Sequence, residues 1–311
     1  MTRIAIIGAG ITGLACAKTL SDAGFQPVLF DKGRGIGGRV ATRRTDNHRF
    51  DHGAPYIDTN NDNFSHVLRG LIDTGNADIW DDGTGRSLIV GTPGMSSIPK
   101  GLAAGLDVRL GTQIKALRPN GQEWRLFYDD VHYDATHVVM TIPAPQIKGL
   151  LGDNHSLVKR VSDVQMSPDL TLMVAISGNP SNVIPIPEGF PLVSITQECR
   201  KPLRPQANTS AWIAHANINF TQAHLEGDLP NIASKMLPFL CDHLNISNDC
   251  VTHSVAHRWL YSRVSKPLGE NFIRTPDKKL YLGGDWCIGP EVEDAWSSGT
   301  AIATDLIEQG L

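Results

Sequence analysis

The sequence has 311 residues, a formal net charge of −4 and a pI near 6.2, which is long enough for one large domain or two interleaved ones. This slightly negative net charge does not indicate binding to nucleic acid or to an anionic membrane. The apolar runs are too short to span a bilayer. The five cysteines contain no C-x-x-C pair. This favours reduced thiols in a cytoplasmic protein over disulfides or a zinc site, and we expect no metal.

The first predicted unit is a strand, a helix and a second strand. Residues 4–7 are a short apolar run typical of a buried parallel strand, and three glycines follow in G-x-G-x-x-G spacing. The glycines allow a tight turn, the approach of a pyrophosphate and close packing of a helix over 11–23, whose free N–H groups face the anion. A strand over 27–30 ends in an acid that suits a ribose diol without a 2′-phosphate. The predicted cofactor-binding residues here are Gly8, Gly10, Ile11, Thr12, Gly13, Asp31 and Lys32.

Three later features predict a second cofactor-binding region. Arg39, in a glycine- and arginine-rich loop over 33–44, could make a bidentate contact to a phosphate, with a basic surface turn as the alternative. Asp285 follows two glycines at the end of a predicted strand and suits a ribityl chain. A helix over 292–309 would direct its first amides at the N1–C2=O edge of a flavin ring, which the backbone over 51–56 would pass. These features favour a resident FAD over a visiting nicotinamide nucleotide. The cofactor-binding residues added are Arg39, Gly53, Ala54, Pro55, Tyr56, Ile114, Gly284, Asp285 and Val292.

The middle of the chain has a different pattern. After an Asn120-Gly121 hairpin, a mostly antiparallel sheet is predicted with strands over 170–177, 191–197, 210–218 and 253–261. One amphipathic helix is expected over 230–244. We therefore predict an α/β fold, a Rossmann-type FAD-binding domain like that of glutathione reductase with an inserted, mostly antiparallel β substrate domain. The FAD-binding domain would comprise 1–75, 92–152 and 270–311, and the substrate domain 76–91 and 153–269.

A set of motifs at both ends of the chain resembles the flavin-dependent amine oxidase superfamily. The motifs are GAGITGL (8–14), DKGRGIGGR (31–39), FDHGAPY (50–56), LYLGGDW (280–286) and VEDAWSSG (292–299). Within that superfamily the chain is similar to the renalase-like proteins of bacteria, through GTPGMSSI (91–98), HRWLYS (257–262) and the GGDWC turn. The resemblance covers both ends well and the middle mainly in strand pattern.

The resemblance implies a bilobal fold with non-covalently bound FAD and oxidation of isomeric dihydronicotinamide nucleotides. Hydride at C2 or C6 of the nicotinamide would pass to flavin N5, and dioxygen would reoxidise the flavin to give hydrogen peroxide. Such a transfer needs no general base, so no catalytic acid–base residue is expected. Two alternatives stay open: an amine or polyamine oxidase of the same superfamily, and an FAD-containing redox sensor without turnover.

The residues that contact the substrate are predicted from three segments. The pocket could be lined by the stretch after the flavin ring, by residues 94–97 before a predicted helix, and by one face of a strand over 257–261. The free amides over 94–97 could hold a phosphate or carboxamide of the substrate, with plain N-capping by a serine as the alternative. The strand face could cover the ring, with a plain aromatic core as the alternative. Trp259 and Tyr261 would share the strand face. The predicted substrate residues are Tyr56, Ile57, Asn60, Asn61, Ser96, Ser97, His257 and Glu291. Glu291 replaces an expected basic residue, and we predict that it repels phosphates and favours NAD-derived over NADP-derived isomers, unless it only caps the helix.

Overall fold

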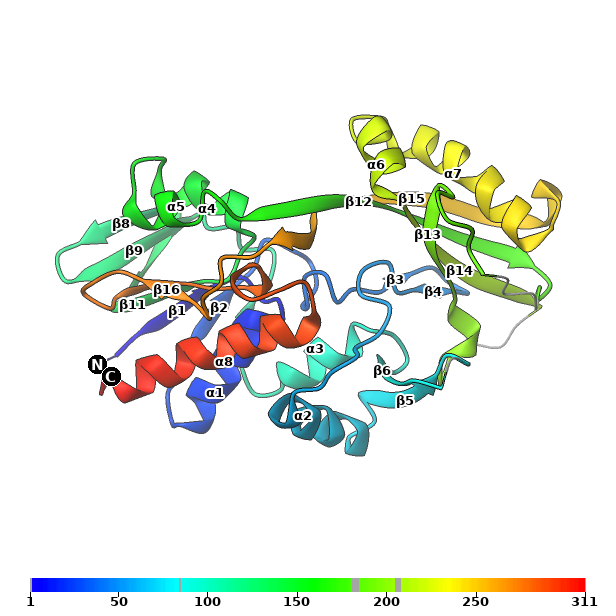
Figure 1. Cartoon of the computed structure of the whole chain (residues 1–311). Helices are drawn as coiled ribbons and strands as arrows, with labels where there is room; N and C mark the ends of the chain where they lie inside the picture. The colour runs from blue at the N-terminus through cyan, green and yellow to red at the C-terminus, as the bar shows by residue number, and fades with distance from the viewer. Residues whose placement is uncertain (1, 84, 181–184, 205–207, 311) are drawn as a thin grey trace.

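The computed structural model describes residues 2–83, 85–180, 185–204 and 208–310. Its N-terminal and C-terminal segments share a six-stranded sheet, which lies at one end of the molecule in Figure 1. From edge to edge its strands are β16 (Ile273–Arg274), β17 (Leu280–Leu282), β11 (His137–Met140), β1 (Ile4–Ile7), β2 (Val28–Phe30) and β7 (Asp107–Arg109). All neighbouring pairs are parallel except β16 with β17. The chain therefore returns near its end to the sheet that contains its first strand, as the paired motifs predict.

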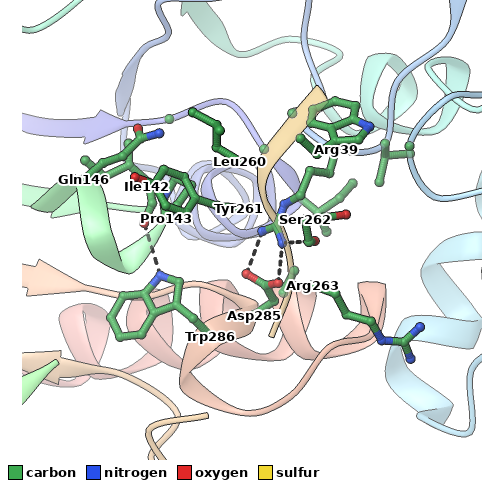
Figure 2. Close-up of a pocket in the computed structure, with 18 of the residues that line it drawn as sticks. Arg39, Ile142, Pro143, Gln146, Leu260, Tyr261, Ser262, Arg263, Asp285 and Trp286 are labelled. Carbon is green, nitrogen blue, oxygen red and sulfur yellow. Dashed lines mark hydrogen bonds and ion pairs between the residues drawn. The ribbon is translucent and has the colours of Figure 1, made fainter. Parts of the chain in front are cut away.

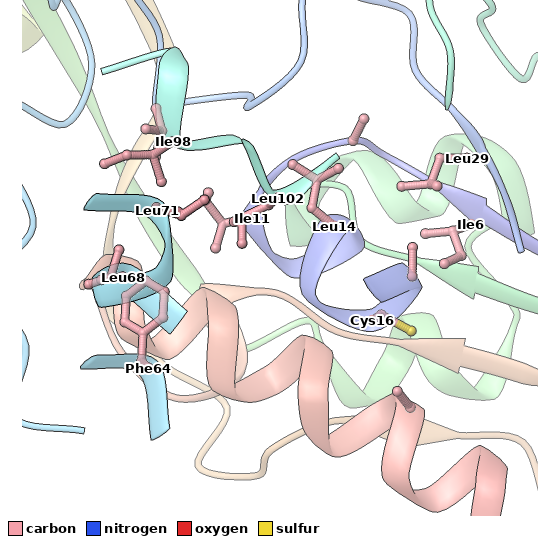
Figure 3. Close-up of a cluster of buried hydrophobic side chains, with 14 of the residues drawn as sticks. Ile6, Ile11, Leu14, Cys16, Leu29, Phe64, Leu68, Leu71, Ile98 and Leu102 are labelled. Atoms are coloured by element: carbon pink, nitrogen blue, oxygen red, sulfur yellow. The ribbon is translucent and has the colours of Figure 1, made fainter. Parts of the chain in front are cut away.

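Both faces of this sheet are covered. Ile4 and Ile6 of β1 pack with helices α1 (Ile11–Asp22) and α8 (Val292–Glu308), in the apolar cluster of Figure 3. Ala5 and Ile7 face the opposite side. That side is covered by a three-stranded sheet and two short helices: β8 (Ala116–Asn120), β9 (Glu123–Tyr128), β10 (Val131–Ala135), α4 (Ala144–Leu151) and α5 (Ser156–Arg160). Burial on both faces explains why these strands are continuous apolar runs.

The second large sheet is antiparallel and has the order β13-β14-β12-β15. Its strands are β13 (Leu192–Gln197), β14 (Thr209–Ala216), β12 (Gln165–Ser177) and β15 (Val251–Lys266), with a short helix η1 (Glu198–Arg200) after β13. In Figure 1, β12 runs from beside the six-stranded sheet into this second lobe. Helices α6 (Ile218–His224) and α7 (Leu229–Leu244) cover one face, where Leu170, Leu172 and Trp212 are buried.

The remaining elements are mostly short. They are β3 (Arg43–Arg44), β4 (Arg49–Phe50), α2 (Asp62–Asp73), β5 (Ala77–Asp81), β6 (Ser87–Gly91), α3 (Ser97–Leu102), η2 (Asn248–Cys250) and η3 (Asp285–Cys287). Phe50 at the end of β4 packs against Met173 of the antiparallel sheet. None of the helices in the described residues combines the length and apolar composition that a membrane span needs.

The α/β class, the Rossmann-like unit and the mostly antiparallel second sheet are confirmed. One local prediction is wrong: the strand expected over 210–218 stops at Ala216, and the unpredicted helix α6 follows. The reason is Asn217, whose side chain accepts a hydrogen bond from Phe220 N (2.8 Å) and so caps that helix. The domain boundaries stay a prediction. Helix α5, assigned to the substrate domain, packs Leu157 into the core beneath the six-stranded sheet.

Candidate active site

A cavity of about 1670 Å³ extends from the six-stranded sheet to the antiparallel sheet. Its lining includes the first glycine turn and the backbone over 53–56 on one side, and residues 167–169 and 257–263 on the other. Typical ligand pockets are about 300–1,000 Å³, so this space is large enough for a dinucleotide and a second small molecule.

The glycine turn provides a cradle for a pyrophosphate. A Cβ built on Gly13 would lie less than 3.0 Å from the carbonyl oxygen of Gly8, so this glycine is needed for the close packing of α1 on β1. Gly10 is different, because a Cβ built there has no heavy atom within 4 Å and Gly10 lines the cavity. Helix α1 begins at Ile11, and its hydrogen-bond series starts with Leu14 N donating to Gly10 O (2.9 Å). The earlier amides are therefore the free N–H groups that an anion accepts.

Asp31 lies at the end of β2, as predicted, and lines the same cavity. Its Oδ2 accepts a hydrogen bond from Ala9 N (2.7 Å) and its Oδ1 one from Gly33 N (2.6 Å), so the carboxylate braces both neighbouring turns. Lys32 and Ile114 also line this end of the cavity. Each carboxylate oxygen retains a further lone pair, so the predicted contact with a ribose diol fits this geometry.

Arg39 has a different partner from the phosphate that the sequence predicts. Its Nη1 and Nη2 donate to the two carboxylate oxygens of Asp285, both at 2.7 Å, and Nη1 also donates to Ser262 O (2.9 Å). Figure 2 shows this fork between the loop after β2, the turn after β17 and strand β15. Asp285 is 4% exposed, so the ion pair is well shielded on the acid's side. Both side chains line the cavity, where they join its two walls.

The backbone over 53–56 lines the cavity as predicted and is held tightly against the preceding loop. Ala54 N donates to Arg39 O (3.0 Å), and a Cβ on Gly53 would collide with that same carbonyl group. Of the other predicted cofactor residues, Val292 lines the cavity at the start of α8, but Gly13 and Gly284 do not belong to the described lining. Gly284 N donates to Ser298 Oγ (3.0 Å), so its role is to join the turn to α8.

Behind this backbone lies a buried charge cluster that the sequence analysis missed. Asp51 Oδ2 accepts from Lys201 Nζ (3.0 Å) and Arg204 Nη2 (2.5 Å), and Lys201 also donates to Glu198 Oε1 (2.6 Å). All four side chains are at most 1% exposed. Although burial alone would raise it, Lys201 and Arg204 hold the pKa of Asp51 well below its usual range. Burial and the Asp51 carboxylate raise the pKa of Glu198 to about 7. The cluster anchors the start of the 51–56 stretch to the antiparallel lobe.

Five of the eight predicted substrate residues lie away from the cavity. The described lining includes Tyr56, His257 and Glu291 but not Ile57, Asn60, Asn61, Ser96 or Ser97. Ile57 is 1% exposed because it forms a β-bridge with Ile89. Asn61 caps α2 by accepting from Phe64 N (3.0 Å), and Asn60 N donates to Glu293 Oε2 (3.1 Å).

The prediction of free amides before α3 is also wrong. Met95 N donates to Asp51 Oδ1 (2.9 Å), and Ser96 N donates to Thr42 Oγ1 (3.0 Å). Ser97 N donates to Gly94 O (2.8 Å). The amides of Met95, Ser96 and Ser97 are therefore taken by protein acceptors, and that of Met95 holds the buried Asp51 carboxylate.

Glu291 both caps a helix and reaches the cavity. It is the N-cap of α8, in a capping box with Asp294, and it lines the cavity. Its Oε1 also accepts from Arg263 Nη2 (2.7 Å). This ion pair, with side chains 68% and 52% exposed, offsets the predicted repulsion of substrate phosphates.

Polar and aromatic side chains gather where the antiparallel sheet meets the cavity. Trp259 Nε1 donates to His52 O (2.8 Å), and the two rings stack with centroids 5.3 Å apart. His257 meets both rings edge-on. Next to them, Asp169 Oδ2 bonds His215 Nδ1 (2.8 Å). The sequence analysis missed this Asp–His pair, because its members come from β12 and β14 and carry no local motif.

Comparison with known proteins agrees with this architecture. Residues 6–71 match the model of an NAD(P)-binding Rossmann-like domain, and residues 73–176 match that of the flavin containing amine oxidoreductases. A putative protoporphyrinogen oxidase from Exiguobacterium sp. 255-15 shares the fold over 99% of both chains, with a TM-score of 0.76 and 15% identity. A putrescine oxidase carrying three substitutions does so over 99% of both chains, with a TM-score of 0.74 and 12% identity.

Sequence relatives match only a short segment. A 15-cis-phytoene desaturase of Synechococcus elongatus is 51% identical over 39 residues, which are 12% of this chain and 8% of the relative. A 4,4′-diapophytoene desaturase of Staphylococcus aureus strain Newman is 41% identical over 55 residues, which are 18% and 11% of the two chains. The two family matches cover separate segments of the chain, and the second makes residues 73–176 similar to the flavin containing amine oxidoreductases.

Proposed function

We propose that this chain binds FAD non-covalently and oxidises 2- or 6-dihydro isomers of NAD(P)H to NAD(P)⁺, with dioxygen as the electron acceptor and hydrogen peroxide as the product. The observation that carries this proposal is the continuous cavity of about 1670 Å³. One end is the glycine cradle and the other is walled by Trp259 and His257. A dinucleotide fits along the first part, and a second flat ring fits against the aromatic wall.

The chain's own residues act by binding and positioning. The free amides of α1 and the open side of Gly10 hold the pyrophosphate, and the first amides of α8 lie beside Val292 at the cavity. Bound FAD would supply the hydride acceptor. Since a dihydropyridine becomes an aromatic cation when it loses hydride, no side chain has to remove a proton. The rate then depends on how the walls orient the two rings, and the contacts of Trp259 with His52 make that wall rigid.

The cofactor is tested on the purified protein. We expect a yellow protein that releases intact FAD on acid or heat treatment, because no cysteine is among the described residues that line the cavity. Chromatography of the supernatant identifies the flavin. Colour that stays in the precipitated protein would contradict non-covalent binding.

The activity is tested by anaerobic mixing. Borohydride-reduced NAD⁺, which contains several dihydro isomers, is expected to bleach the flavin within seconds, while pure 4-dihydro NADH and simple amines do not. Stopped-flow absorbance records the bleaching, and admission of oxygen should restore the colour and form peroxide. If no small reductant bleaches the flavin, the chain is better described as an FAD-binding redox sensor.

An amine or polyamine oxidase is the second candidate, and one observation favours it. Asp169 lines the aromatic-walled cavity and carries a carboxylate that could hold a substrate ammonium group. Fast bleaching by putrescine or benzylamine, with none by the dihydro isomers, would transfer the assignment to this reaction.

A further inference from the structure

One face of the antiparallel sheet changes from apolar to polar along its length. Met173 and Ala175 of β12 pack with Phe50 on this face, opposite to the face that α6 and α7 cover. Asp169 and Thr171 continue the same face toward the cavity because side chains alternate along a strand. Cross-strand pairing sets His215 and His257 beside Thr171 and sets Trp259 beside Asp169. Three strands therefore bring a polar cluster to the cavity that hydride transfer itself does not use.

Asp169 presents one carboxylate oxygen to the cavity. Its Oδ2 accepts from Thr171 Oγ1 (2.9 Å) and lies 2.8 Å from His215 Nδ1, so the carboxylate orientation is set from behind. Its Oδ1 forms no hydrogen bond with any described residue. Oδ1 is not fully buried either, and Asp169 lines the cavity. Asp169 Oδ1 is thus an accessible hydrogen-bond acceptor with a fixed direction.

His257 supplies a complementary donor. Burial and the nearby Arg43 lower the pKa of His257, so its ring is neutral at pH 7 and carries one N–H. Within the described chain neither ring nitrogen has a hydrogen-bond partner, and neither is buried. The ring is held edge-on to Trp259, with centroids 4.5 Å apart. No group of three or more His, Cys, Asp or Glu in the described residues is placed to hold a metal ion.

We propose that Asp169 and His257 form the binding subsite for the carboxamide of the nicotinamide ring, an inference that rests on the proposed function. Asp169 Oδ1 accepts from the amide N–H, and the His257 N–H donates to the amide carbonyl. The two side chains are diagonal neighbours across β12 and β15 on one face of the sheet, and such neighbours are close enough for one small planar group to contact both.

The chemistry of the pair selects against related substituents. A carboxylate in the same position would face the Asp169 carboxylate and be repelled. An ammonium group would satisfy Asp169 but would leave the His257 N–H without an acceptor. The primary amide uses both groups, because it carries two donors and an acceptor.

The test compares three pyridines that differ only in the substituent at position 3: nicotinamide, nicotinate and 3-(aminomethyl)pyridine. Binding to the holoprotein is measured by calorimetry and by the change in flavin absorbance, without turnover. We expect nicotinamide to bind about tenfold or more tightly than nicotinate, and more tightly than the amine. Asp169→Asn should reduce the amide-to-acid ratio to about threefold or less. The control is Asp163→Asn, which changes the charge equally at a side chain that is 86% exposed and outside the cavity lining.

The outcomes separate this inference from the proposed activity. Equal binding of nicotinamide and nicotinate, or a ratio unchanged in Asp169→Asn, would overturn the subsite. Tightest binding of the amine would assign Asp169 to an ammonium group instead. An amide preference without bleaching by the dihydro isomers would refute the proposed activity and leave the subsite standing. If Asp169→Asn does not retain flavin, His257→Phe decides, with an expected loss of about tenfold for nicotinamide and no loss for 3-(aminomethyl)pyridine, which has no acceptor for the His257 N–H.

Discussion

Gly10 and Gly13 are three residues apart in one turn, but the structure predicts opposite results when each is replaced by alanine. Gly10 has φ −76° and ψ 179°, which alanine adopts without strain, and its Cβ would meet no heavy atom within 4 Å. Because alanine also reduces the freedom of the unfolded chain, Gly10→Ala should stabilise the apoprotein by about 0.4–1 kcal/mol. The same methyl group would project into the cavity where the pyrophosphate approaches the backbone.

The expected cofactor effect of Gly10→Ala is therefore a loss. Displacing the pyrophosphate from one or two amide hydrogen bonds, at about 1–3 kcal/mol each, lowers FAD affinity by about tenfold to a hundredfold or more. At Gly13 the added Cβ collides with the Gly8 carbonyl, so α1 must move away from β1. Gly13→Ala should destabilise the apoprotein by about 1–3 kcal/mol and weaken FAD binding as well.

Urea unfolding of the apoproteins and titration with FAD, followed by flavin fluorescence, measure the two quantities separately. Gly24→Ala is not a suitable control because Gly24 has φ +91°. Gly70→Ala is suitable, since Gly70 lies in α2 with open space at its Cβ and outside the cavity lining. The reasoning is refuted if Gly10→Ala binds FAD like the wild type, or if it unfolds more readily than Gly13→Ala.

Three further predictions follow from the ion pairs. Arg39→Lys should lower the free energy of unfolding by about 1–3 kcal/mol, because one ammonium group cannot satisfy both oxygens of the buried Asp285; unchanged denaturant midpoints would contradict this. Glu198 has a pKa raised to about 7, so the folded state holds this proton more tightly than the unfolded chain does. The free energy of unfolding should therefore fall by up to about 3 kcal/mol as the pH rises from 4.5 through 7. In Glu198→Gln this pH dependence should be absent from the unfolding curves. Glu291→Gln releases Arg263, so KM for the 2′-phosphorylated isomers should fall by no more than about fivefold relative to KM for the NAD-derived isomers. An unchanged ratio of kcat/KM between the two substrate families would exclude Glu291 from substrate selection.

The nucleotide-binding half could be predicted from the sequence because its determinants are local. The glycine spacing, the helix start at Ile11 and the acid at Asp31 lie within one stretch of chain, and each acts on its immediate neighbours. The position of β17 in the same sheet was predicted as well, because a short apolar strand that ends in Gly-Gly-Asp is typical of a nucleotide-binding sheet.

The substrate half could not be predicted in the same way, because its contacts join distant segments. The amides of Met95 and Ser96 looked free in the sequence, but Asp51 and Thr42 reach them from more than forty residues away. Arg39 looked like a phosphate ligand because its partner Asp285 lies 246 residues further along the chain. For Met95 and Ser96 the fold supplies the partners that the sequence assigned to a ligand. Arg39 is paired with Asp285 and lines the cavity, so its contact with a phosphate stays a prediction.

The same long-range contacts give the site its rigidity. Arg39 links the glycine loop to Asp285 and to the carbonyl of Ser262, next to a β-bulge where residues 260–262 of β15 have only Pro168 opposite them on β12. Bulges of this kind redirect side chains, and this one lies where the strand passes from the cavity wall to the cofactor lobe. The contacts of Arg39 with Asp285 and Ser262 consequently fix the position of the sheet face that carries Trp259 relative to the glycine turn at Gly10. The proposed hydride transfer would depend on the alignment of two rings, and such a fixed separation would favour it.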